Sequence, residues 1–128
     1  MNCLDTNVLI DYLEGDPAVG AFIEAHESVP MFAPVPALFE VFIGASRLRG
    51  ETGIERARSD LDWLEPVPLT IGGAAEAARI DAELHASGEP IDSLDTLIAG
   101  VAREAGATVV TRDGHFERVE NLDVELID

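Results

Sequence analysis

The chain has 128 residues, 47% of them hydrophobic, and these two numbers bound the class of protein. A chain of this length is expected to form one domain, residues 1–128, around one core. Its apolar content excludes an intrinsically disordered segment. We find no uncharged stretch long enough to cross a bilayer and no secretory signal. The single cysteine, Cys3, cannot form an internal disulfide, so a reducing cytoplasm is the expected location.

Charge is the unusual part of the composition. Asp and Glu total 25 against 8 basic residues, all of them Arg, which gives a net charge of −17. Such an excess is typical of adaptation to a high-salt cytoplasm, where a Debye length of about 3 Å at molar salt screens the repulsion between surface carboxylates. We therefore expect a halophilic source. Most of the acids then serve solvation, so only its position in the chain can mark an acid as functional.

Short strands and helices alternate along the chain. The pattern predicts a strand over 1–4, helices over 7–14 and 17–26, and a strand over 31–33. Helices over 36–49 and 52–64 follow, separated by Gly50, and then a strand over 66–69. The last part contains helices over 72–87 and 93–105 and strands over 107–111 and 124–127, with a turn over 112–114. Strands separated by helices predict an α/β fold with a central parallel sheet of about five short strands flanked by helices.

Four acids are distinguished by their positions. Asp5 and Asp113 each follow a predicted strand, and ligands of open α/β sheets bind at the carboxyl ends of strands. Glu40 is the only charged residue between Val29 and Arg47. Asp95 lies in the first turn of its helix and heads a face that is otherwise apolar. A cluster of such carboxylates would bind a hard cation, Mg²⁺ or Mn²⁺, that keeps several waters.

Three of these acids also have a purely structural interpretation. Asp5 could cap the helix that follows it, Asp95 could interact with its helix dipole, and Asp113 could form an Asp-Gly turn. Asp92 is the expected cap of the helix over 93–105, with an auxiliary ligand as the alternative. Glu40 is harder to explain structurally, because a lone buried carboxylate costs several kcal/mol unless it is paired or bound to metal.

Other kinds of site find less support. His26, His85 and His115 are not spaced as a zinc motif, and there is no cysteine pair, glycine-rich phosphate loop or nucleophile elbow. Receiver-type phosphoacceptor domains and haloacid-dehalogenase-like phosphatases use a lysine beside their acids, and this chain has no lysine.

Four segments, residues 4–11, 36–41, 94–100 and 110–116, are together similar to the motifs of one family. In these segments the chain resembles the PIN-domain ribonucleases, and most closely the VapC-type toxins of toxin–antitoxin modules. The resemblance spans nearly the whole chain. Gly100 stands where the family's Asp-x-x-Ile-Ala-Ala segment has its second Ala, and relatives often have Asn at the position of Asp113.

The resemblance implies a PIN-like three-layer fold and an Mg²⁺- or Mn²⁺-dependent endoribonuclease. The implied catalytic residues and metal ligands are Asp5, Glu40, Asp95 and Asp113, supported by Thr6, Asn7, Thr111 and Asp92. A bound cation would activate water for attack on an RNA phosphodiester, and a second ion near Asp113 would assist the leaving oxygen. The resemblance also implies a homodimer and a cognate VapB-like antitoxin that blocks the site. A housekeeping RNA-processing nuclease and a catalytically inactive PIN-like binding module remain as alternatives.

A net charge of −17 opposes RNA binding, which normally depends on Lys and Arg. Arg112, next to Asp113, is the first candidate for a phosphate contact. Arg47 and Arg49 are further candidates, although ordinary surface salt bridging is the favoured interpretation for these two.

Overall fold

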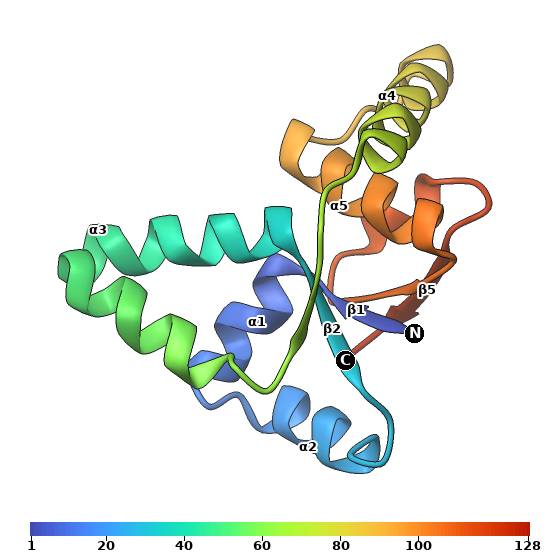
Figure 1. The fold of residues 1–128 in the computed structure, drawn as a ribbon. Coiled ribbons are helices and arrows are strands. Elements are labelled where there is room, and N and C mark those ends of the chain that lie inside the picture. Colours follow the sequence, from blue (N-terminus) through green and yellow to red (C-terminus); the bar gives the residue numbers. More distant parts are fainter.

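The computed structural model describes all of residues 1–128 (Figure 1). The strands are β1 (Asn2–Leu4), β2 (Met31–Pro34), β3 (Glu65–Val67), β4 (Thr108–Thr111) and β5 (Asp123–Leu126). The helices are α1 (Thr6–Leu13), α2 (Pro17–Ala25), α3 (Val35–Asp60), α4 (Ile71–Ala86) and α5 (Ser93–Ala105), with a 3₁₀ helix η1 (Gly114–Arg118). None of these helices has the length and apolar content needed to cross a membrane.

The five strands form one sheet in the order β3-β2-β1-β4-β5, and every neighbouring pair is parallel. The predicted α/β architecture is therefore confirmed. The chain first runs outward from β1 to β2 and β3, and then returns to place β4 and β5 on the other side of β1. Figure 1 shows α1 and α3 on one side of the sheet and α4 and α5 on the other. The direction of strand order changes between β1 and β4, which is where open α/β sheets leave a crevice for ligands.

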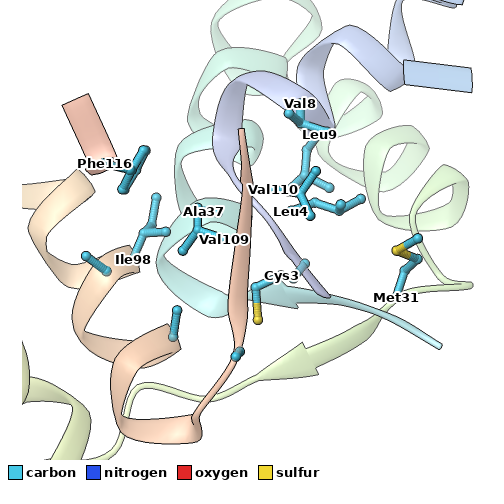
Figure 2. Packing of buried hydrophobic residues seen from close by; sticks show 14 of the residues in the cluster. Cys3, Leu4, Val8, Leu9, Met31, Ala37, Ile98, Val109, Val110 and Phe116 are labelled. Atoms are coloured by element: carbon cyan, nitrogen blue, oxygen red, sulfur yellow. The ribbon is translucent and has the colours of Figure 1, made fainter. Parts of the chain in front are cut away.

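The core lies on both faces of the central strands. Val109 and Val110 of β4 are completely buried and point to opposite faces, as successive residues of a strand must. Figure 2 shows Ile98 and Phe116 on the side of Val109, and Leu4, Val8 and Leu9 on the side of Val110. A strand covered on both faces has no solvent side, which explains why this segment is a continuous apolar run.

The observed elements differ from the predicted ones mainly in the middle of the chain. The helices predicted over 36–49 and 52–64 are the two arms of α3, and the break predicted at Gly50 is confirmed because the backbone of Gly50 is not helical. The second arm ends at Asp60, earlier than predicted. Gly50 has φ +59°, a left-handed conformation that glycine adopts without steric cost. The strand predicted over 66–69 begins one residue earlier and is shorter. The helix η1, capped by the Asp113 side chain, was not predicted.

Close packing of α4 on α5 explains the glycine that replaces alanine in the family motif. A Cβ atom on Gly100 would lie 2.6 Å from both the Cβ and the backbone nitrogen of Ala77 in α4. Backbone atoms cannot move aside as a flexible side chain can. The small residue at position 100 thus sets how closely the two helices approach.

We predict that Gly100→Ala lowers the free energy of unfolding by about 1–3 kcal/mol, the usual cost of overpacking. Gly20→Ala is the matched control, because Gly20 is also helical and an added Cβ there would meet no atom within 4 Å. The control should be neutral or stabilising by up to about 1 kcal/mol, from helix propensity alone. Urea unfolding of the two variants measures the difference, and equal stability would contradict the packing argument.

Candidate metal centre

The four acids come together at the carboxyl edge of the sheet, from four different connections. Asp5 directly follows β1, and Asp113 lies two residues after the end of β4, the neighbouring strand at the switch point. Glu40 lies in the first turns of α3, which starts immediately after β2. Asp95 reaches the same edge because α5 precedes β4 and runs antiparallel to it, so its first turn lies where β4 ends. The direction of α5 thus brings Asp95 to the site, which could not be predicted from the sequence.

Asp5 is the most buried of the four acids, with 3% of its surface exposed. The hydroxyl of Thr111 donates a hydrogen bond of 2.5 Å to Oδ2, and the backbone N–H of Val8 donates one of 2.9 Å to Oδ1. The second bond makes Asp5 the N-cap of α1. Burial raises the pKa of the Asp5 carboxyl, the two donors counteract the rise, and the charge of Asp113 adds to it. Asp5 is therefore both a helix cap and a member of the cluster.

Glu40 is less buried than the sequence suggests. Its side chain is partly exposed, and Oε1 accepts a hydrogen bond of 2.7 Å from the hydroxyl of Thr6. The prediction of a lone buried carboxylate is corrected in this respect, because only part of the apolar run faces the core: Ala37 and Val41 are buried, whereas Phe39 next to Glu40 is exposed. Asn7 is exposed and forms no side-chain hydrogen bond.

Asp95 carries the largest electrostatic strain in the cluster. Burial raises the pKa of the Asp95 carboxyl to about 7, and Asp92, Glu40 and Asp5 add to the rise. Asp92 itself is exposed, and its Oδ1 accepts a hydrogen bond of 3.0 Å from the backbone N–H of Asp95. This bond makes Asp92 the N-cap of α5, in agreement with the preferred interpretation of that residue.

His115 connects two of the acids, a contact that the sequence analysis missed. Its Nδ1 lies 2.6 Å from Oδ1 of Asp113, and its Nε2 lies 2.9 Å from Oδ2 of Asp95. Nε2 is nevertheless buried without a hydrogen bond of acceptable geometry. The sequence did offer a signal: His115 comes two residues after Asp113 and shortly after a predicted strand, so both side chains lie at the carboxyl edge of the sheet. The search for zinc-binding spacing did not detect the role of His115, because its partners are carboxylates and not other zinc ligands.

The donor set suits a hard divalent cation, since it consists of carboxylates with hydroxyl groups behind them. As the side chains stand, no three Asp, Glu, His or Cys residues converge closely enough to hold a metal ion. The pKa of Asp95 is raised first by burial and then by the charges of Asp92, Glu40 and Asp5, and a cation bound among the acids would favour their charged forms. The unsatisfied Nε2 of His115 also indicates a polar centre that lacks a partner.

Arg112, the first candidate for a phosphate contact, is already engaged. Nη1 contacts Asp11 at 2.9 Å and Asp16 at 2.8 Å, and Nη2 donates hydrogen bonds to Asp16 and to the carbonyl of Asp128. These contacts tie the loop after β4 to α1, to the start of α2 and to the last residue. They also lower the pKa of Asp16. A phosphate at Arg112 would have to compete with all three partners.

The family model for the PIN domain matches residues 3–122. The chain belongs to the PIN-domain family. It is 32% identical to the tRNA(fMet)-specific endonuclease VapC of Shigella flexneri, over 95% of this chain and 94% of that protein. The fold is similar to a chain of DNA-bound VapBC from Salmonella typhimurium, with TM-score 0.87 and 28% identity over 97% of this chain and 96% of that one. A chain of VapBC2 from Rickettsia felis gives TM-score 0.90 at 24% identity, with 99% and 98% covered.

We predict that the metal-free protein becomes less stable as the pH rises from about 4 to about 7. In this range the folded state keeps a proton on Asp95 that the unfolded state has lost, so raising the pH favours unfolding. Asp95→Asn should flatten this part of the pH dependence, whereas Asp81→Asn, at an exposed position on α4, should leave it unchanged. Thermal unfolding in EDTA measures the effect. Parallel curves for the wild type and Asp95→Asn would contradict it.

Proposed function

We propose that this chain is a divalent-metal-dependent endoribonuclease, the toxin of a type II toxin–antitoxin pair. The observation that carries the proposal is the convergence of Asp5, Glu40, Asp95 and Asp113 at the switch point of a PIN-domain sheet. The endonuclease name of the Shigella flexneri relative supports RNA as the substrate. The electrostatics favour an enzyme over an inactive binding module, since a module without metal would have no use for four mutually repelling carboxylates.

The four acids are the proposed ligands of Mg²⁺ or Mn²⁺. Such a cation lowers the pKa of a bound water and stabilises the charge that develops on the scissile phosphate. Two threonine hydroxyl groups hold the proposed ligands in position. Thr111 holds Asp5 and accepts a hydrogen bond from the backbone N–H of Asp113, so one hydroxyl orients both acids that follow strands. Thr6 holds Glu40 in the same way.

The N-termini of three helices meet at this edge and contribute favourable electrostatics. The helices α1, α3 and α5 all begin at the carboxyl edge, and the positive ends of their dipoles point toward the acids. Asp5 and Asp92 satisfy free N–H groups of α1 and α5. The dipoles partly offset the repulsion between the carboxylates and would also attract a phosphate once a cation is bound.

The proposed partners are a VapB-like antitoxin and a second copy of the chain. The antitoxin is proposed because similar folds occur in the VapBC complexes from Salmonella typhimurium and Rickettsia felis. Leu69 and Ile71, at the start of α4, are 42% and 92% exposed, and these apolar side chains suit a contact with a second copy. A small antitoxin-like reading frame beside the gene would support the toxin assignment over a housekeeping nuclease.

The Asp5→Asn variant tests the nuclease directly. We expect it to lose RNA cleavage by on the order of a hundredfold or more, because the amide removes a charge from the proposed metal site while it can still cap α1. Gel assays of RNA cleavage with added Mg²⁺ or Mn²⁺, with EDTA as the metal-free control, measure the loss. Asp81→Asn serves as the matched control and should cleave like the wild type. Full activity of Asp5→Asn, with circular dichroism showing an intact fold, would refute the assignment.

We further propose that the acid excess adapts the protein to high salt. The midpoint of thermal unfolding should rise as KCl increases from 0.1 M to molar concentrations, because the Debye length falls from about 10 Å to about 3 Å. The same titration near pH 4, where about half of the carboxyl groups are neutral, is the control and should show a smaller rise. A midpoint that falls or stays constant at neutral pH would reject salt adaptation.

A further inference from the structure

The arginines of this chain divide into two groups of four. Arg79, Arg103, Arg112 and Arg118 each form a salt bridge with a carboxylate. Arg47, Arg49, Arg56 and Arg58 are exposed, form no salt bridge or side-chain hydrogen bond, and all lie on α3. Residues 47–58 contain only two acids, Glu51 and Glu55, so this segment is positive in a chain of net charge −17. Free cations gathered on one element of an acidic protein indicate an anionic partner.

Arg47 lies on the same face of α3 as Glu40. The two residues are seven positions apart, which corresponds to about two helical turns and an advance of about 10 Å along the axis. Glu40 belongs to the acid cluster, and the helical spacing therefore places Arg47 in line with it along the first arm of α3. An RNA strand with its scissile phosphate at the cluster would bring a neighbouring phosphate to this arginine.

An exposed aromatic ring, Phe39, lines the same groove as Arg47. Phe39 directly precedes Glu40, and 54% of its surface is exposed. Together with Arg47 it lines a groove whose other wall includes Ile54, from the second arm of α3. Phe42, Ile43 and Ser46 complete the lining. An exposed ring beside a free guanidinium is the combination that binds unpaired nucleotides, through base stacking and a phosphate contact.

We propose that this groove binds one unpaired nucleotide of the substrate RNA next to the scissile phosphate. The base stacks on Phe39 and the phosphate contacts Arg47. This proposal rests on the ribonuclease function proposed above, because Phe39 of the groove directly precedes Glu40 of the acid cluster and the groove would bind the same RNA strand as the cluster. Arg49, Arg56 and Arg58 add attraction at longer range. An acidic peptide would match the arginines but would stack on Phe39 only through an aromatic side chain of its own.

The contribution of Arg47 is measured by the salt dependence of binding. The probe is a fluorescein-labelled single-stranded RNA of mixed sequence, and the Asp5→Asn background prevents cleavage during the fluorescence anisotropy titration. We expect Arg47→Gln to reduce the slope of log Kd against log[KCl] by about 0.7, the value for one phosphate contact on a single strand. Arg79→Gln, which removes an exposed arginine paired with Glu76, is the matched control and should keep the slope. Equal slopes for the two variants would overturn the proposal.

The contribution of Phe39 is measured with the same probe. Phe39→Ala should weaken binding between about fivefold and a hundredfold, the range for loss of one stacked base. Phe39→Tyr should bind like the parent, since any aromatic ring can stack on a base. Leu126→Ala, at a residue on β5 that is 45% exposed, is the control for loss of surface apolar area and should bind like the parent. If Tyr fails to restore binding, the stacking role is wrong.

Analytical ultracentrifugation of the variants tests whether the groove binds a second copy of the chain instead of RNA. A change in oligomeric state for Phe39→Ala would assign the groove to a second copy of the chain and overturn the proposal. Wild-type cleavage of RNA with unchanged binding by both variants would overturn this inference and leave the proposed function intact. Failure of the wild type to cleave any RNA with Mg²⁺ or Mn²⁺, in contrast, would remove the proposed function and this inference with it.

Discussion

The hydrogen bond from Thr111 to Asp5 is the interaction on which the rest of the site depends. It joins the ends of β1 and β4, two strands that are neighbours in the sheet although these residues are 106 positions apart in the chain. A carboxylate as buried as Asp5 would cost several kcal/mol without such a donor. The same hydroxyl accepts a hydrogen bond from the backbone N–H of Asp113. A shift of β4 against β1 would therefore disturb the sheet and the acid cluster together.

The acid cluster lowers the stability of the folded state, because it brings several carboxylates close together. Asp95 shows this cost most clearly, because burial and three neighbouring acids raise its pKa to about 7. The fold is stabilised by other parts of the molecule: the core that covers both faces of β4, and the close contact of α4 with α5 at Gly100. His115 lies between Asp95 and Asp113, with one ring nitrogen near each carboxylate. Strain of this kind is common at functional sites, where chemistry needs groups that do not stabilise the fold.

Charge is distributed unevenly over the molecule, and the distribution carries more information than the total. Four arginines are neutralised by nearby acids, and one of them, Arg112, binds the chain's own acids in place of the phosphate that its position beside Asp113 suggested. The four arginines without such partners all lie on the two arms of α3, which begins at the acid cluster. A net charge of −17 therefore does not describe the surface that an RNA would meet.

The sequence by itself determined the α/β class, most element positions and the identity of the four acids. These follow from local causes: apolar runs that form buried strands, caps such as Asp92, and the glycines that end helices. Only the tertiary structure decided the rest. The direction of α5 brings Asp95 to the site, while His115, Thr6 and Thr111 acquire partners that are distant in the chain. Glu40 proved half-buried, because the burial of a side chain depends on neighbours that packing supplies.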